Sequence, residues 1–307
     1  MLTRTNDPDT GKAGTEPIPP RADSGRLEPM SIPPIVTDTV ESYLALADAE
    51  APGLIEGFYL EGSVALGDFR PEASDIDFVA VTAAPPDAVV LAALERVHTQ
   101  LRQQQRRPFF DGTYLTWNDL TAGPAAAIGR PISLEGQLQA KSFAGQQTPV
   151  TWHTLAHHGV ALRGPAIDDL DIWTDPAALA TWQNTNLDRY WANGLSRAAR
   201  LISKPGIGLL TDYGTVWTVT GISRLHYTIA TGDITSKDGA GRHALHTFPD
   251  HWHRIINEAL RIRRGDSRQP LYRNPLTRRR DILAFGNMAI ANAHNIYDNQ
   301  SAPEDVG

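Results

Sequence analysis

Two aspartates that flank a single apolar residue are the clearest chemical feature of the sequence. Residues 75–82 read as a β-strand, and alternate side chains of a strand point to the same face. Asp75 and Asp77 therefore share a face, where two carboxylates repel each other unless a cation lies between them. Mg²⁺ prefers such oxygen ligands and accepts phosphate oxygens beside them. The pair predicts a magnesium site that also receives a phosphorylated substrate.

A glycine and a serine precede this pair, at the end of the predicted strand 57–62. Gly62 allows a ligand to approach the backbone closely, and Ser63 offers a hydroxyl and an amide to a phosphate group. Ser74 lies directly before the aspartates. Gly-Ser and Asp-x-Asp are each common, but the two motifs on consecutive strands are far more specific. We therefore expect Gly62, Ser63 and Ser74 to bind phosphate beside the metal site.

This arrangement resembles the signature of the polymerase-β-like nucleotidyltransferase superfamily, in which Gly-Ser is followed by Asp-apolar-Asp-apolar at about this distance. The resemblance implies a third acid on a neighbouring strand, and Asp111 in the predicted strand 109–116 matches it. Asp111 would then be a metal ligand, the base that accepts a proton from the attacking hydroxyl, or both. Gly112 departs from the pattern, which has an apolar residue there. The alternative is that Asp111 and Gly112 form a turn.

The second half of the chain resembles the helical domain of aminoglycoside adenylyltransferases of the streptomycin/spectinomycin type. Ser223-Arg224 on a predicted helix, and Lys237 after the turn that begins at Thr231, carry this likeness. It implies that Arg224 and Lys237 contact the nucleotide phosphates across a cleft. The alternative, from residue type alone, is that Arg224 packs its aliphatic stem against neighbouring residues and that Lys237 is exposed to solvent. The likeness does not extend to acceptor recognition, because Asp212 is displaced by about two residues, which turns a helix by roughly 200°.

Hydrophobic periodicity predicts an α+β protein, in which a mixed β-sheet domain with flanking helices is followed by an all-helical domain. We expect the nucleotidyltransferase domain at 35–168 and the helical domain at 169–300, with disordered tails at 1–34 and 301–307. The predicted strands are 57–62, 75–82, 109–116, 132–139 and 159–162, and the predicted helices are 36–49, 85–105, 177–202, 213–231, 248–264 and 278–297.

Composition narrows the class of protein further. The 307 residues include no cysteine, which excludes disulfides, thiolate zinc sites and a cysteine nucleophile. No apolar run is long enough to span a bilayer, so we expect a soluble, cytoplasmic protein with no membrane partner. A formal net charge of −7 disfavours general binding of nucleic acid.

Two clusters in the second half leave alternatives open. Arginines crowd residues 254–280, which favours a solvated surface but also suits an anionic partner such as RNA. Four histidines lie at His243, His246, His251 and His253, but their spacing matches no zinc motif.

Together these features predict a nucleotidyltransferase that depends on Mg²⁺, with two ions held by Asp75, Asp77 and Asp111. It would transfer AMP from ATP to a hydroxyl of a small, aminoglycoside-like acceptor. The alternatives are transfer to a protein or an RNA end, and a catalytically silent homologue that binds nucleotide.

Overall fold

The computed structural model describes residues 32–141 and 147–301. From Ile32 onward the chain forms one compact unit. Most of the two predicted tails, at 1–31 and 302–307, lies outside the described residues. Pro34 and Ser301, which the sequence places in those tails, are instead the first and last residues of helices α1 (Pro34–Glu50) and α12 (Pro275–Ser301).

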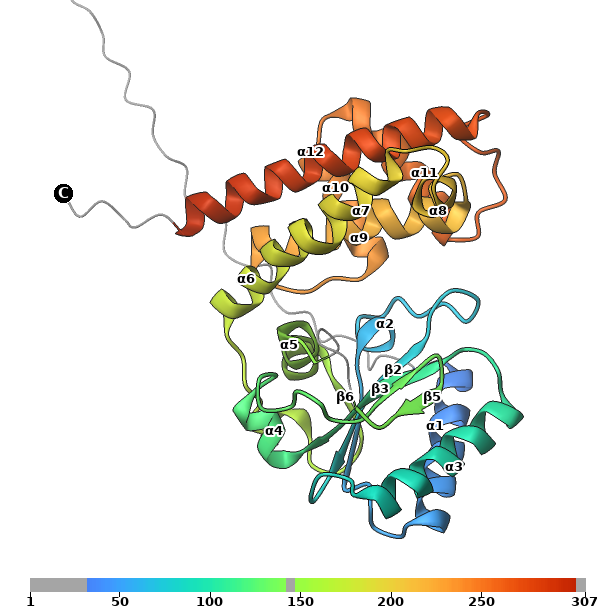
Figure 1. Ribbon diagram of the computed structural model, residues 1–307, viewed down its shortest axis with the longest axis vertical. Coiled ribbons are helices and arrows are strands. Elements are labelled where there is room, and N and C mark those ends of the chain that lie inside the picture. Colours follow the sequence, from blue (N-terminus) through green and yellow to red (C-terminus); the bar gives the residue numbers. More distant parts are fainter. Residues whose placement is uncertain (1–31, 142–146, 302–307) are drawn as a thin grey trace, which may run out of the picture. The chain divides into compact units, whose positions relative to one another are not determined.

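A six-stranded mixed sheet organises the first half (Figure 1). Its order is β5-β4-β3-β2-β1-β6. Strands β2 and β3 run parallel, and the other pairs run antiparallel. The strands are β1 (Gly57–Leu60), β2 (Ile76–Thr82), β3 (Phe110–Thr116), β4 (Ile132–Leu134), β5 (Gln137–Gln139) and β6 (Val160–Arg163). The parallel pair requires a crossover, which helix α3 (Ala88–Gln104) supplies.

Helices cover both faces of this sheet, so its central strands are buried on both sides. Helices α1 and α3 pack on one face, where rings such as Tyr43, Phe58 and Phe78 lie in contact. The shorter helices α4 (Trp117–Ala122) and α5 (Pro149–His158) pack on the other face, around Trp152. Because β2 is enclosed in this way, its position is fixed by packing along most of its length.

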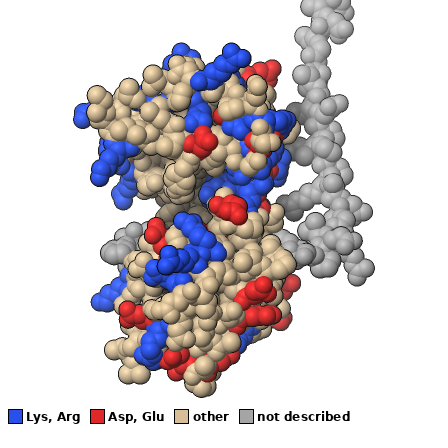
Figure 2. Space-filling view, turned by 90° about the vertical axis from the view of Figure 1, so that its right-hand side faces the viewer, with Lys and Arg blue, Asp and Glu red and all other residues tan. Residues whose placement is uncertain are grey.

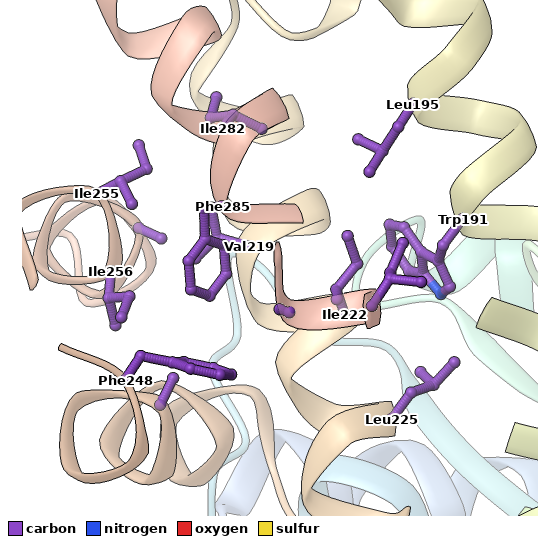
Figure 3. Packing of buried hydrophobic residues seen from close by; sticks show 14 of the residues in the cluster. Trp191, Leu195, Val219, Ile222, Leu225, Phe248, Ile255, Ile256, Ile282 and Phe285 are labelled. Atoms are coloured by element: carbon purple, nitrogen blue, oxygen red, sulfur yellow. The ribbon is translucent and has the colours of Figure 1, made fainter. Parts of the chain in front are cut away.

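The second half of the unit is helical and is built around α9 (Asp212–Thr231). Figure 3 shows its core, in which Val219 and Ile222 of α9 lie near Phe248, Phe285 and Leu195. The other elements are α6 (Pro176–Asn186), the π-helical segment η2 (Leu187–Ala192), α7 (Asn193–Ala198), α8 (Lys204–Gly208), α10 (Lys237–Thr247) and α11 (His253–Arg263). Short elements α2 (Gly62–Ala65), η1 (Ile167–Asp169) and η3 (Asp250–Trp252) complete the fold.

The predicted α+β class is confirmed, and two local predictions are wrong. The expected strand 132–139 is a hairpin, because Glu135 and Gly136 adopt positive φ angles of 52° and 71° and turn the chain. Residues around Lys237 were expected in a loop, but they begin helix α10. Gly239 and Gly241 hid that helix, since glycine has low helix propensity; a Cβ on Gly241 would lie 2.5 Å from Leu260 of α11.

None of the described helices is both long and apolar enough to cross a membrane.

A buried histidine lies beneath the sheet. His98 of α3 is 2 % exposed, and its Nε2 lies 2.7 Å from the hydroxyl of Tyr114, which is 2.8 Å from that of Tyr43. Burial lowers the pKa of His98 to about 4. The folded protein therefore holds a neutral imidazole over a pH range in which the unfolded chain is protonated.

We expect acid to destabilise the protein through this residue. Because the unfolded pKa is near 6.5, stability is lost as the pH falls from about 6.5 towards 4, by about 2 kcal/mol at pH 5. Urea unfolding at pH 7 and pH 5 measures this loss, and His98→Gln should reduce it. An equal loss in both proteins would show that other groups cause the acid sensitivity.

Candidate active site

The carboxylates of Asp77 and Asp111 lie side by side on the parallel strands. Asp77 of β2 is paired in register with Asp111 of β3, and Asp75 directly precedes β2. Burial, together with the charges of Asp75 and Asp111, raises the pKa of Asp77 to about 7, while Arg224 opposes the shift. Three neighbouring carboxylates at one end of β2 and β3 repel each other, so a cation bound between them would be stabilising.

Asp111 is held by the hairpin that the sequence did not predict. Its two carboxylate oxygens accept hydrogen bonds from the amides of Gly136, at 2.8 Å, and Glu135, at 3.0 Å. These bonds oppose the effect of burial, which raises the pKa of Asp111 to about 6. The alternative of an Asp-Gly turn is wrong, since both residues lie within β3. A Cβ on Gly112 would lie 2.2 Å from the carbonyl oxygen of Phe78, so the close approach of β2 and β3 requires glycine there.

Gly62 brings the backbone against Asp77. Its φ is +59°, and a Cβ would lie 2.1 Å from the Asp77 Oδ2 atom. The backbone amide of Ser63 donates a hydrogen bond to the Asp77 carboxylate. The Ser63 hydroxyl oxygen is buried and finds no hydrogen-bond partner among the described residues. Such a group is one that a ligand could satisfy.

Ser74 has a structural partner. Its hydroxyl accepts a hydrogen bond of 3.1 Å from the amide of Arg70, and its own amide donates to the Arg70 carbonyl at 2.7 Å. Ser74 thereby closes the loop that leads into β2.

Arg224 and Lys237 bring positive charge from the helical half. Arg224 is half-buried on α9, and its Nε donates to the carbonyl of Thr235 at 3.2 Å. Lys237 is the first residue of α10, and its Nζ lies 5.4 Å from the centre of the Trp217 ring. Burial lowers the pKa of both groups, and Asp77 opposes the shift in each. The structure therefore brings both cations within electrostatic range of the carboxylates.

Sequence reasoning missed an ion-pair network that ties the two halves together. Asp68, in the loop after Ser63, accepts hydrogen bonds from the guanidinium of Arg263 at 2.7 Å and from the amide of Asp238 at 3.2 Å. Asp238 follows Lys237 directly and pairs with Arg264 at 2.6 Å. The buried Asp68 carboxylate thus connects the loop after Ser63 to the start of α10.

Glu61 was also missed. It lies directly before Gly62, and burial together with the charge of Asp77 raises its pKa well above the usual value. Its position in the sequence, between a predicted buried strand and the Gly-Ser pair, could have indicated a buried acid beside the site.

The arginine cluster is largely used for internal contacts. The guanidinium groups contact carboxylates or backbone carbonyls of this chain at Arg254, Arg261, Arg263, Arg264, Arg268, Arg278, Arg279 and Arg280. On the face drawn in Figure 2, basic side chains are interspersed with acidic ones. These pairings reduce the net positive charge that the cluster could offer to an RNA partner.

No group of three or more histidine, aspartate or glutamate side chains within 32–141 and 147–301 is arranged to hold a metal ion. The histidine cluster therefore gives no metal site in the described part of the chain. The three aspartates do not form such a group by themselves either, so ligands from a substrate would be needed to complete a site beside Asp75 and Asp77.

Two family models match the chain. A nucleotidyltransferase domain matches residues 47–111, and the C-terminal domain of aminoglycoside adenylyltransferase matches residues 207–280. The structure also resembles a crystal structure of spectinomycin adenyltransferase AAD(9) from Enterococcus faecialis with ATP and spectinomycin. The TM-score is 0.56 at 12% sequence identity, over 85% of this chain and 99% of that chain. Among curated proteins, no significant match is found.

The first match shows that residues 47–111, which carry Asp75, Asp77 and Asp111, are similar to a nucleotidyltransferase domain. The second match shows that residues 207–280 are similar to the C-terminal domain of aminoglycoside adenylyltransferase. The resemblance to nucleotidyltransferases and to aminoglycoside adenylyltransferases that the sequence predicts is confirmed by these matches, as is the enzyme class, a nucleotidyltransferase.

A methyl group at residue 62 tests the contact with Asp77. We expect Gly62→Ala to lower nucleotidyl transfer at least 100-fold, because the new Cβ would displace the Asp77 carboxylate. The positive φ adds a stability cost of about 1–2 kcal/mol. Pyrophosphate release and thermal unfolding measure the two effects.

Gly53→Ala is the matched control. Gly53 has a φ of +76°, and a Cβ there would have no atom of the described residues within 4 Å. The variant should lose similar stability and keep its turnover. Full activity in Gly62→Ala, or an equal loss of activity in the control, would contradict this account of the turn.

Proposed function

We propose that this enzyme transfers AMP from ATP to a hydroxyl of a small, aminoglycoside-like acceptor in a reaction that depends on Mg²⁺. One observation carries the proposal: the carboxylate of Asp77 lies within electrostatic range of two cations, Arg224 and Lys237, which belong to the helical half. Carboxylates on one side and cations on the other suit a metal–triphosphate complex. The match to a structure that contains ATP and spectinomycin supports the choice of ligands.

The residues present fit Mg²⁺. Asp75 and Asp77 are oxygen ligands whose mutual repulsion a dication would relieve, and phosphate oxygens would complete the coordination. Bound there, the ions would neutralise the triphosphate and stabilise charge on the attacking and leaving oxygens. The unpartnered hydroxyl of Ser63 would donate to a phosphate oxygen, and Ser74 would support the same loop.

The remaining residues have distinct roles in this proposal. The acceptor oxygen attacks the α-phosphorus, the bond from that phosphorus to the bridging oxygen breaks, and pyrophosphate leaves. Asp111, whose pKa is raised to about 6, accepts the proton of the acceptor hydroxyl. Arg224 and Lys237 stabilise the departing pyrophosphate. Residues 35–168 would act as the nucleotidyltransferase domain and 169–300 as the helical domain.

The alternatives have less support. Transfer to an RNA end has less support because much of the arginine cluster is paired within this chain, for example Arg261 with Glu258 and Arg278 with Asp212. A silent homologue has no need to retain Asp75, Asp77 and Asp111 together at the end of β2 and β3.

The test is an assay with ATP labelled at its α-phosphate, Mg²⁺ and a panel of hydroxylated small molecules that includes spectinomycin and streptomycin. Mass spectrometry should detect an acceptor increased by one AMP. Lys237→Ala should lower kcat/KM by roughly 10- to 100-fold, because a charge-assisted hydrogen bond to phosphate is lost.

Lys204→Ala is the matched control for Lys237→Ala. Each lysine is the first residue of a helix capped by a serine, at Ser203 and Ser236, but Lys204 is exposed and does not line the cavity beside Lys237. Its removal should leave turnover unchanged. Label recovered only in protein or RNA would contradict the small acceptor, and equal effects of the two variants would contradict the role of Lys237.

A further inference from the structure

The carboxylate of Asp111 is oriented by a backbone turn and not by a side chain. Glu135 and Gly136 form this two-residue turn between β4 and β5, and their amides donate to the two oxygens of Asp111. A positive φ costs energy at Glu135, which is not a glycine, so contacts around the turn are needed to hold it there. The direction of the Asp111 carboxylate therefore depends on what supports the turn.

Helix α3 supports this turn at two points. The buried imidazole of His98 donates a hydrogen bond to the carbonyl oxygen of Gly136. Arg102, one helical turn further along α3, packs its aliphatic stem on the same glycine, where an added Cβ would lie 3.2 Å from the arginine Cδ atom. His98 is thus one hydrogen bond away from the residue whose amide contacts Asp111 at 2.8 Å.

The neighbours of His98 determine where its proton lies. Ser133 lies 3.4 Å from Nδ1, but its hydroxyl donates to the carbonyl of Phe110 at 2.7 Å, so Nδ1 is the nitrogen that carries the proton. The neutral ring then accepts at Nε2 from the hydroxyl of Tyr114, which in turn accepts from that of Tyr43. Burial keeps the ring neutral, because it lowers the pKa of His98 to about 4. The imidazole is therefore held in one tautomer and one orientation.

We propose that His98 is a positioning residue for Asp111, and that its hydrogen bond to Gly136 keeps the two amides of the turn where they aim the carboxylate at the acceptor hydroxyl. The contacts run from α3 through the turn to the end of β3 that carries Asp111. A reacting group needs such support from the residues behind it, since a small displacement slows the chemical step. This inference rests on the proposed function for the role of Asp111 as the base, and on the contacts alone for the support of the turn.

Hydrogen exchange in the free protein tests whether His98 holds the turn. NMR follows the amide of Gly136, with the amides of β2 as the reference for global unfolding. His98→Leu, which removes both ring nitrogens, should speed exchange at Gly136 at least 10-fold relative to β2, because the turn loses this hydrogen bond. His98→Asn, whose amide nitrogen takes the place of Nδ1, should restore slow exchange. The control is Leu94→Ala, which shortens a buried side chain one turn earlier on α3 and should leave exchange at Gly136 slow.

Steady-state kinetics tests the effect on catalysis, with MgATP and spectinomycin, or the member of the panel that accepts AMP. His98→Leu should lower kcat roughly 10- to 100-fold and leave the KM for MgATP within about twofold, because a misdirected base slows the chemical step and not nucleotide binding. His98→Asn should recover most of the kcat, and Leu94→Ala should keep it. An equal loss of kcat in His98→Leu and Leu94→Ala would show that His98 only stabilises the fold, and would overturn the inference.

The outcomes separate the two proposals. If wild type transfers AMP to no acceptor of the panel, the proposed function fails, while the exchange experiment still decides whether His98 holds the turn. Unchanged exchange at Gly136 in His98→Leu, or faster exchange with an unchanged kcat, overturns the role of His98 and leaves the proposed function intact. If His98→Leu does not fold, His98→Gln replaces it, because the longer amide reaches the place of Nε2 and leaves Gly136 without a donor.

Discussion

The repulsion among three carboxylates is the constraint on which the rest of this structure depends. The parallel register of β2 and β3 places Asp77 beside Asp111, with Asp75 at the start of the same strand. Burial strengthens their mutual repulsion, because charge is poorly screened away from water. The fold tolerates this cost since the enclosed sheet fixes both strands. A site that holds several carboxylates close together in this way is ready to bind a divalent cation, which is the property the proposed chemistry uses.

The helical half supplies the countercharge, and one buried carboxylate helps to fix its placement. Asp68 contacts Arg263 and the amide of Asp238, so it connects the loop after Ser63 to α10 and α11. That contact fixes Lys237 relative to the carboxylates on the sheet. The same helices leave a cavity lined by tryptophans beside Arg224.

Strong local signals made much of this predictable from the sequence. The Asp75/Asp77 pair follows from strand periodicity, and Arg224 lies on a long amphipathic helix. Other features depend on contacts between distant segments, which local patterns do not encode. The hairpin that holds Asp111 arises from positive φ angles at Glu135 and Gly136, and the Asp68–Arg263 pair joins residues far apart in the chain.

The central claim is that the carboxylates on β2 and β3 bind a divalent metal together with the nucleotide. Electron paramagnetic resonance of Mn²⁺, titrated into the protein with a non-hydrolysable ATP analogue, measures this directly. The account predicts that wild type removes the signal of free Mn²⁺ and that Asp77→Asn, which keeps the shape of the side chain but loses its charge, binds at least 10-fold more weakly. Equal Mn²⁺ binding by the two proteins would contradict the account.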